Sequence, residues 1–373
     1  MRSPEPAADA VIGWDVGGAH LKACLLVDGQ VQDVAQWVCP LWQGLQHLED
    51  GLAQARARWP QTQDAQHAVT MTGEMTDLFA DRADGVQRIA ALLEAQWPGR
   101  VRLYAGPGQW VAPVQAGAAW PEIASANWRA TAQHVAQRHG RGLLVDIGST
   151  TTDLIAFDGG ELLGHSLSDR DRLASGELVY QGVVRTPLCA LVQRIALQGQ
   201  ALNVMNEFFA TAADVYRLTG ELDPDHDLHP AADGAAKTPA ATRARLARMV
   251  GCDVRDASDA DWLAFARTWR EAQLALIATE LARVLDAHRL GLRGAAVVAA
   301  GAGAFLLPDL LQRLPERFGA AEGVKLDYGQ DVASIGRGDR YDALLRGARL
   351  CAPSVAVAAL FAQAQKKNQK ERV

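Results

Sequence analysis

One local pattern occurs twice in the chain, and this duplication constrains the fold more than any other feature. In each copy a short apolar run contains an aspartate near its end, a glycine follows two positions after the aspartate, and two further strand-like runs come next. The first copy is the run 11–16 around Asp15, and the second is the run 142–147 around Asp146, 131 positions later. Internal repetition of this kind is typical of a duplicated architecture.

The runs that follow each aspartate have the pattern of β-hairpins. Runs 20–27 and 31–38 flank Asp28-Gly29, and an Asp-Gly pair between apolar runs is a strong hairpin signal. Runs 152–157 and 161–166 flank a similar turn in the second copy. We therefore predict an α/β fold with two related lobes, each beginning with a three-stranded meander and covered by helices.

The rest of the chain supplies the other elements of such lobes. We expect, in chain order, a helix at about 44–58, a strand at 67–72, a helix near 84–96, a strand at 101–104, a helix over 259–289, a strand at 295–300, a helix ending near 315 and a last helix from about 353. The 373 residues suit two domains. The expected organisation is a disordered N-terminus at 1–10, a first lobe at 11–140, a second lobe at 141–350 with a helical insertion at about 190–290, and a C-terminal helix with a frayed basic tail at 351–373.

Composition excludes several classes of function. The formal net charge is −6 without any run of Lys and Arg, which argues against nucleic acid or an anionic membrane as the main partner. The five cysteines are odd in number and form no Cys-x-x-Cys pair, so neither a disulfide framework nor a thiolate zinc site is indicated. The first ten residues have no apolar core of a signal peptide, and the apolar stretch 294–307 is too short to span a bilayer. We expect a soluble cytoplasmic protein that binds small molecules, with a homodimer as one option for its oligomeric state.

The first Asp-x-Gly loop has the residues of a phosphate site. Gly17 and Gly18 let backbone N–H groups approach phosphate oxygens, where a Cβ would block them. Asp15 would hold Mg²⁺, directly or through water, and Lys22 would neutralise the anion if its side chain points toward it. The alternative is an ordinary tight turn with a solvated aspartate.

The second loop repeats this arrangement and adds hydroxyl groups. Asp146 and Gly148 correspond to the first copy, and Ser149, Thr150 and Thr151 are neutral hydrogen-bond donors to phosphate. A polar hairpin corner is the alternative. In a duplicated fold, the two loops are expected to face each other across a cleft between the lobes and to hold one anion from both sides. A third element, the strand that leads into Gly301 and Gly303, is typical of nucleotide contacts and also of helices packed closely on a sheet.

At these three motifs the sequence resembles the actin-like ATPase superfamily, which has a ribonuclease H-like fold, and more closely its hydantoinase/oxoprolinase branch. It is most similar to the family of tetrahydromethanopterin-linked one-carbon-transfer pathway proteins, whose archaeal members are synthases of methanofuran biosynthesis. The matching stretches cover nearly the whole chain: 15–23, 70–79, 146–154, 175–188, 211–220, 233–253 and 299–307.

The resemblance implies a transferase. It would join the phenol of γ-glutamyltyramine to an aminomethylfuran that carries a methyl diphosphate, releasing diphosphate, in the synthesis of a methanofuran-type cofactor for one-carbon metabolism. Mg²⁺ is the expected metal ion. ATP is not expected to be consumed, because Ala19-His20 replaces the Thr or Ser that ATP-using members carry after the glycine pair, although ATP use stays open.

The resemblance also implies roles for individual residues. Catalytic roles would fall to Asp15, Asp146, Glu74 and His20, with the two aspartates positioning the metal. The diphosphate would be held by Gly17, Gly18, Lys22, Gly148, Ser149, Thr150, Thr151 and Arg185. Substrate or nucleotide contacts would come from Asp77, Glu177, Asp233, Gly301 and Gly303. For Glu74 and Asp77, the alternative is that acids at a helix start interact with the helix dipole.

Two further features bear on function. The segment 221–241 is rich in Pro, Asp, His and Ala, and we expect an exposed loop. Its group Asp223, Asp225, His226, Asp227 and His229 resembles a metal site, but no regular period makes these side chains converge, so a solvated loop is favoured. Two other functions stay open: an ATP-dependent amide or lactam hydrolase or small-molecule kinase, and a non-catalytic nucleotide sensor.

Overall fold

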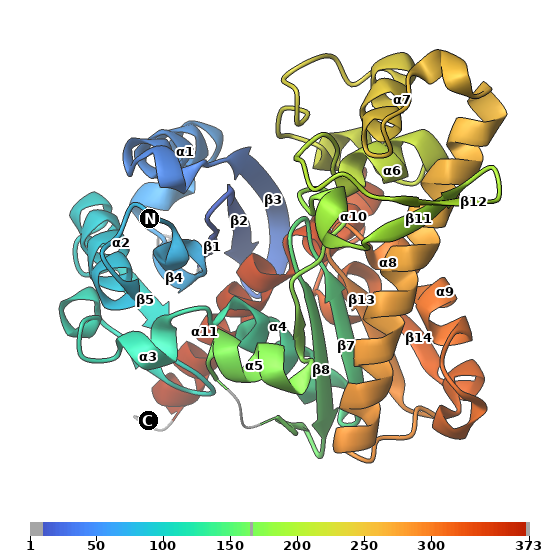
Figure 1. The fold of residues 1–373 in the computed structure, drawn as a ribbon. Helices are drawn as coiled ribbons and strands as arrows, with labels where there is room; N and C mark the ends of the chain where they lie inside the picture. Colours follow the sequence, from blue (N-terminus) through green and yellow to red (C-terminus); the bar gives the residue numbers. More distant parts are fainter. Residues whose placement is uncertain (1–9, 165–166, 371–373) are drawn as a thin grey trace. The chain divides into compact units, whose positions relative to one another are not determined.

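The computed structural model describes residues 10–164 and 167–370 and contains two compact units. Unit 1 comprises residues up to Gly140, the segment 157–169 and residues from Asp327 onward, and unit 2 comprises 141–156 and 170–326. Each unit is built on a β-sheet with helices, which confirms the α/β class (Figure 1). The expected N-terminal segment 1–10 lies outside the described residues except for Ala10, which begins the first strand.

Unit 1 contains a six-stranded sheet in the order β3-β2-β1-β4-β5-β6. Its strands are β1 (Ala10–Val16), β2 (His20–Val27), β3 (Gln30–Val38), β4 (Gln66–Met71), β5 (Val101–Tyr104) and β6 (Trp110–Val111). The strands β1, β2 and β3 form the predicted antiparallel meander, and Asp28 and Gly29 at the turn between β2 and β3 both have positive φ. On the other side, β4 pairs with β1, and β5 with β4, in parallel.

Helices cover both faces of this sheet. The helices of unit 1 are α1 (Gln46–Arg58), α2 (Arg82–Gln96), α3 (Trp120–Ile123), α4 (Asn127–His139), α10 (Tyr341–Leu350) and α11 (Ala352–Lys370). Trp14 and Leu21 point to the face covered by α1 and α2, where they join the main apolar core of the unit. Gly13 points to the opposite face, where an added Cβ would lie 2.0 Å from the Ser354 carbonyl oxygen of α11.

The second sheet repeats this plan. Its order is β10-β8-β7-β13-β14, with β9 paired to β8, and β13 runs parallel to β7. Its strands are β7 (Gly142–Ile147), β8 (Thr152–Asp158), β9 (Glu161–Leu162), β10 (Leu178–Val179), β13 (Ala296–Ala300) and β14 (Val324–Asp327). The expected strand 161–166 is shorter than predicted, and residues 165–166 lie outside the described part of the chain. A meander on one side and a parallel strand on the other confirm the predicted duplication.

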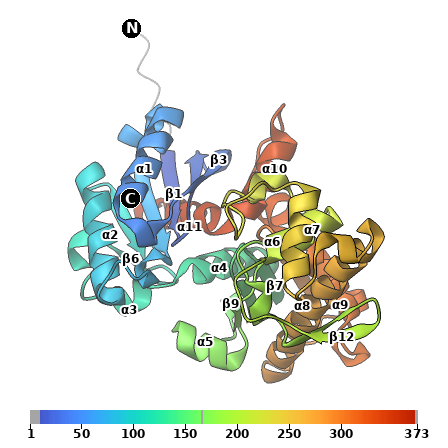
Figure 2. The same ribbon diagram turned by 45° about the horizontal axis from the view of Figure 1, so that its top comes forward.

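The insertion of unit 2 has its own core. It contains the hairpin β11 (Arg194–Leu197) and β12 (Gln200–Asn203), and the helices α6 (Ala212–Thr219), α7 (Pro239–Arg248) and α8 (Asp259–Ala287); α5 (Asp169–Ser175) precedes it and α9 (Leu307–Gln312) follows it. Helix α8 packs against α6, α7 and α9, and it lies beside α7 in both views (Figures 1 and 2). Trp262, Phe265 and Trp269 of α8 are buried in this core.

Two expected boundaries are corrected by the structure. Residues 327–350 belong to unit 1, not to the second lobe, because α10 contacts β3 and α11 contacts β1, β2 and β4. The basic tail is helical through Lys370, because α11 continues to that residue. Among the described residues no single helix is long and apolar enough to span a membrane, and only α10 and α11 taken together, across a bend of 96°, meet the length and composition criteria.

Candidate functional site

The first loop forms a sharp turn at the end of β1. The Gly17 backbone N–H donates to the His20 carbonyl oxygen at 3.0 Å, which closes the turn. A Cβ at Gly17 would lie 2.9 Å from that same oxygen, so a side chain does not fit there. Gly17 and Gly18 are partly exposed, whereas Asp15 and His20 on either side are buried. The two glycines therefore form the accessible part of the loop.

The two charged residues beside this turn have protein partners. Asp15 Oδ1 accepts a long hydrogen bond of 3.4 Å from the Asn127 amide at the start of α4. Lys22 lies opposite Asp15 in the β1–β2 register, but its Nζ donates to the Leu350 carbonyl oxygen at 3.0 Å. Lys22 therefore stabilises the end of α10, where carbonyl oxygens lack helical partners, and its role at a phosphate stays a prediction.

The segment 72–77 packs against the first loop. The Thr72 backbone N–H donates to the Val16 carbonyl oxygen at 3.0 Å. A Cβ at Gly73 would lie 3.1 Å from that oxygen, and one at Gly18 would lie 3.1 Å from the Thr76 methyl group. Asp77, a predicted substrate contact, is exposed in the turn that follows.

Glu74 is buried behind this segment. Its Oε1 accepts a hydrogen bond from Ser125 Oγ at 2.9 Å and lies 4.0 Å from Arg82 Nε. Burial raises the pKa of Glu74 to about 7, with the Ser125 hydrogen bond and Arg82 opposing the shift. An added Cβ at Gly85 of α2 would lie 2.8 Å from the Glu74 Cβ, so this glycine admits the side chain. Glu74 lies in the first turn of a short 3-10 helix (Gly73–Met75), as the alternative expected, but its carboxyl group is buried and accepts from Ser125; Asp81 caps α2.

Ser125 connects Glu74 to other charged groups. It adopts φ of 51°, a left-handed conformation that is uncommon for serine. Its Oγ lies 2.7 Å from Arg82 Nη2 and 3.0 Å from Asp169 Oδ2, and Arg82 also pairs with Asp169. A hydroxyl group has one proton, so Ser125 donates to only one of the two carboxylates at a time. Ser125 was missed by the sequence analysis, as were Arg82 and Asn127.

The second loop has the same turn as the first. The Gly148 backbone N–H donates to the Thr151 carbonyl oxygen at 2.8 Å, matching the bond from Gly17 to His20. The Ser149 carbonyl oxygen accepts from the backbone N–H groups of Val184 at 3.1 Å and Arg185 at 2.8 Å. Residues 148–151 are partly exposed, and the Ser149 and Thr150 hydroxyl oxygens lie 3.4 Å apart. The duplication thus extends to the hydrogen bonding of the loops.

Glycines allow neighbouring segments to approach the second loop closely. A Cβ at Gly182 would lie 2.5 Å from the Gly148 carbonyl oxygen. Gly301 has φ of 80°, and its Cβ would lie 2.3 Å from the Ile147 carbonyl oxygen and 2.5 Å from Asp146 Oδ1. The Gly303 N–H donates to the same Ile147 oxygen at 2.8 Å. The Gly-x-Gly motif therefore packs directly against the end of β7, and its contact with a nucleotide stays a prediction.

Arg185 lies next to the hydroxyl groups of this loop. Its Nη1 is 3.5 Å from Thr150 Oγ1, at the long limit of a hydrogen bond. Burial lowers the pKa of Arg185, and Tyr180 opposes the shift, yet a guanidinium stays charged at every physiological pH. The predicted diphosphate ligand is thus close to the predicted diphosphate loop within one unit.

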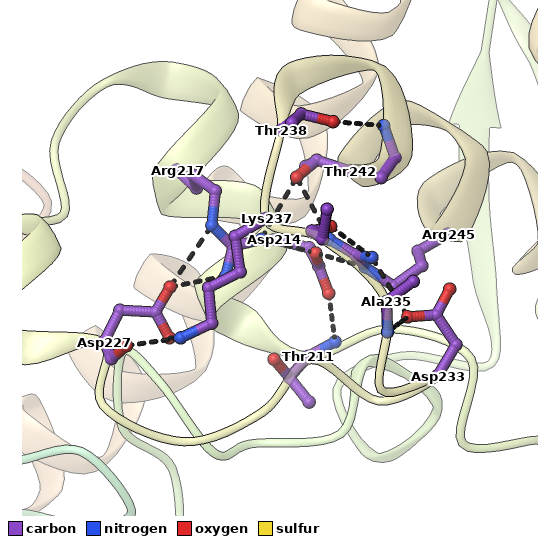
Figure 3. A network of polar contacts seen from close by, with 12 residues as sticks. Thr211, Asp214, Arg217, Asp227, Asp233, Ala235, Lys237, Thr238, Thr242 and Arg245 are labelled. Carbon is purple, nitrogen blue, oxygen red and sulfur yellow. Dashed lines mark hydrogen bonds and ion pairs between the residues drawn. The ribbon is translucent and has the colours of Figure 1, made fainter.

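The carboxylates of Glu177 and Asp233, two predicted ligand contacts, are paired with other side chains of the protein. Glu177 is buried, with Oε1 at 3.0 Å from His288 Nε2 and Oε2 accepting from Ser175 Oγ at 3.2 Å. These partners indicate a structural role, and the ligand contact of Glu177 stays a prediction. Asp233 pairs with Arg245 at 3.1 Å (Figure 3) and also with Arg248 at 3.4 Å. Its predicted substrate contact likewise stays a prediction.

The Asp/His segment is not a metal cluster. No group of three or more His, Cys, Asp or Glu side chains in the described residues is arranged to hold a metal ion. The segment is also less exposed than predicted, since the Asp227 side chain is 7% exposed and pairs with Arg217 and Lys237 (Figure 3). Asp15 and Asp146 are both buried, and their predicted role in positioning a metal ion stays a prediction.

Comparison with known proteins gives one family match and two similar synthases. Residues 65–324 match the model of a family described as hydantoinase/oxoprolinase. A synthase from Methanocaldococcus jannaschii, named (4-{4-[2-(γ-L-glutamylamino)ethyl]phenoxymethyl}furan-2-yl)methanamine synthase, is 28% identical over 324 residues, covering 87% of this chain and 93% of the relative. A protein of the same name from Methanococcus vannielii is 30% identical over 196 residues, covering 51% of this chain and 84% of the relative.

The fold has relatives among solved structures as well. A nucleotide-free structure of acetone carboxylase, from work on ATP-dependent acetone carboxylation, is similar with a TM-score of 0.53 at 10% identity. The similarity covers 94% of this chain and 70% of that one. It supports the predicted duplicated, actin-like α/β fold.

Proposed function

Because the chain belongs to the hydantoinase/oxoprolinase family, we propose that it is a diphosphate-releasing transferase that forms an aryl ether. The phenol of γ-glutamyltyramine would be joined to an aminomethylfuran that carries a methyl diphosphate. The observation that carries this proposal is the match over 87% of the chain to a synthase named for such a product, whose phenoxymethyl group links phenol oxygen to the furan. The chain is accordingly an enzyme.

The proposed step balances in atoms and charge. A bond forms between the phenol oxygen and the methylene carbon on the furan, and the bond from that carbon to the diphosphate oxygen breaks. The diphosphate leaves with the electron pair of the broken bond, and the phenol proton passes to a base. The furan ring stabilises positive charge on the methylene carbon, so the main task of the protein is to stabilise the charge that develops on the diphosphate.

The second loop has groups suited to this task. The hydroxyl groups of Ser149 and Thr150 are partly exposed and can donate to phosphate oxygens, and the Arg185 guanidinium lies beside them. Asp146 precedes the loop and would hold Mg²⁺, as Asp15 would beside the first loop. When bound, Mg²⁺ would neutralise charge on the diphosphate.

The phenol proton requires an acceptor. His20 directly follows the glycine turn of the first loop, and its carbonyl oxygen closes that turn. We assign it as the acceptor, with Glu74 and Ser125 maintaining the segment behind the loop. The product would serve a methanofuran-type cofactor of tetrahydromethanopterin-linked one-carbon metabolism in the cytoplasm, with neither nucleic acid nor membrane as a partner.

A second candidate is an ATP-dependent hydrolase or a kinase, and the hydrolase agrees with the family description hydantoinase/oxoprolinase. Thermal unfolding with Mg²⁺ and either diphosphate, ADP or ATP separates the two, because a ligand that binds only the native state raises the melting temperature. Stabilisation by diphosphate and not by ATP supports the transferase. Stabilisation by ATP, followed by release of inorganic phosphate, supports the hydrolase or kinase.

A further inference from the structure

The segment 182–186 binds two carbonyl oxygens of the second loop. The carbonyl oxygens of Gly148 and Ser149 accept from the three consecutive backbone N–H groups of residues 183–185, at distances of 3.1, 3.1 and 2.8 Å. In a trans peptide the C=O and the N–H point in opposite directions, and no cis peptide occurs among the described residues. The N–H groups that follow these two carbonyls, those of Ser149 and Thr150, therefore point away from the segment.

Gly182 lies directly on the backbone of the loop. A Cβ at Gly182 would lie 2.5 Å from the Gly148 carbonyl oxygen and 2.5 Å from the Thr150 backbone nitrogen. The Gly182 N–H donates to Thr186 Oγ1 at 2.8 Å, and the Gly182 carbonyl oxygen accepts from the same hydroxyl group at 3.0 Å. Because the contact is this close, a shift of the Gly182 backbone would displace the loop.

A buried side chain of helix α8 also binds the Gly182 carbonyl oxygen. Gln273 is 1% exposed, and its Nε2 donates to that oxygen at 3.0 Å. Its Oε1 accepts from the hydroxyl group of Tyr216 in α6 at 2.7 Å, and Tyr216 is buried as well. A carbonyl oxygen can only accept, so the amide nitrogen faces Gly182 and the amide oxygen is left for Tyr216. The order of this hydrogen-bonded chain is therefore fixed by the chemistry of its groups.

The Tyr216 ring extends the chain to the Gly-x-Gly segment. It packs edge-on against Phe305, with the ring centroids 5.4 Å apart and an angle of 73° between the planes. Phe305 follows Gly303, whose N–H donates to the Ile147 carbonyl oxygen just before the loop. Tyr216 and Gln273 thus connect the two segments that pack against the second loop, and all these residues belong to unit 2.

An amide at position 273 is not needed for packing. Trp269 and Ile277, one turn before and one turn after it on the same buried face of α8, are apolar. A buried amide costs free energy unless its hydrogen bonds are made, whereas an apolar side chain would fill the space without that requirement. What Gln273 adds is a fixed position for its partner, the Gly182 carbonyl oxygen.

We propose that Gln273 is a positioning residue for the transferase: through Gly182 it holds the second loop with the Ser149 and Thr150 N–H groups directed at the substrate diphosphate. The inference rests on the proposed function. Because Gln273 is buried, it acts through Gly182 and does not contact the substrate. Donors that are held in direction before the reaction stabilise the charge on the leaving diphosphate without reorganisation.

Calorimetric titration of the full chain with Mg²⁺ and inorganic diphosphate tests the inference. We expect Gln273→Leu to raise the Kd by about 10-fold, the usual effect of losing one hydrogen bond to a charged group. The matched control is Trp262→Phe on the same helix, which removes a buried donor that bonds the Val254 carbonyl oxygen at 2.9 Å. It should lower the melting temperature, as Gln273→Leu does, and leave the Kd unchanged.

Gln273→Glu provides a rescue that depends on pH. A protonated carboxyl group has the shape of the amide, and it can donate to Gly182 while accepting from Tyr216. Burial raises the pKa of a carboxyl group, so the variant should be protonated in mild acid and charged in mild base. At each pH we compare its Kd with that of the wild type. The ratio should be about 1 near pH 5.5 and about 10 near pH 8.5.

Three results overturn this inference alone, provided that the wild type binds diphosphate. They are an unchanged Kd for folded Gln273→Leu, a loss of affinity that Trp262→Phe reproduces at an equal fall in melting temperature, and a Gln273→Glu ratio that does not change with pH. The last of these decides the matter if Gln273→Leu does not fold. Failure of the wild type to bind diphosphate overturns the proposed function and this inference together.

Discussion

Glu74 Oε1 and Ser125 Oγ lie 2.9 Å apart in the interior of unit 1, although 51 positions separate them in the sequence. The pairing buries a carboxyl group whose pKa is raised to about 7 from an ordinary value of 4.5. The folded chain therefore retains a proton that the unfolded chain releases between these two pH values. The contribution of Glu74 to the free energy of unfolding is therefore largest below pH 4.5, and it falls as the pH rises toward 7.

Replacing Glu74 by Gln should remove this pH dependence. We expect the free energy of unfolding of the wild type to drop by on the order of 3 kcal/mol between pH 4.5 and pH 7 because of this group. The Glu74→Gln variant should lack this decrease and be the more stable protein at pH 8. Urea unfolding at pH 5 and pH 8 measures both. The exposed Glu122→Gln serves as the control, and identical pH profiles for wild type and Glu74→Gln would contradict the assignment.

The aspartates that precede the two loops should be essential for turnover. We expect Asp15→Asn and Asp146→Asn each to lower kcat by about 100-fold or more, a typical effect of losing a charge that stabilises a transition state. Both replacements preserve shape, so the circular dichroism spectrum should be unchanged. The exposed Asp158→Asn at the far end of β8 is the control. Near-normal turnover in either variant removes that aspartate from the mechanism.

Gly301 should tolerate a side chain much less well than Gly294. Both have positive φ, at 80° and 66°, so an alanine at either position costs about 1–2 kcal/mol of backbone energy. Only at Gly301 does the Cβ also collide with Ile147 and Asp146, which should add roughly 1–3 kcal/mol. Urea unfolding of the two alanine variants gives the difference. Diphosphate binding should weaken only in Gly301→Ala, and equal effects in both variants would show that the close packing is unimportant.

Glu177 should matter for stability and not for substrate affinity. Glu177→Ala removes the hydrogen bonds to Ser175 and His288 and should destabilise the protein by about 1–3 kcal/mol. The KM for the diphosphate substrate should stay within twofold of the wild type if the fold is retained at the assay temperature. A KM that rises tenfold with unchanged stability would instead support Glu177 as a ligand contact.

The two loops could be predicted because their signals are local. A buried strand, an aspartate and a glycine turn are contiguous in sequence, and their repetition after 131 positions indicated duplication. Asp28-Gly29 likewise predicted its hairpin because only a few residue types adopt positive φ easily. These parts of the fold needed no knowledge of long-range contacts.

The remaining contacts depend on partners that are distant in sequence. Strand alternation places Lys22 on the same face as Asp15, but its length lets it reach Leu350 at the end of a helix that was not predicted. Ser125 has a conformation that its residue type does not indicate. Asp227 was expected to be solvated because its arginine partner belongs to α6, and the ion pair exists only once that helix has packed.

Product formation tests the central proposal most directly. The purified chain is incubated with Mg²⁺, γ-glutamyltyramine and the aminomethylfuran methyl diphosphate, and ether and diphosphate are quantified by mass spectrometry and ion chromatography. The account predicts that both products form in equal amounts when ATP is omitted. Absence of the ether, or a strict requirement for ATP with release of inorganic phosphate, would contradict it.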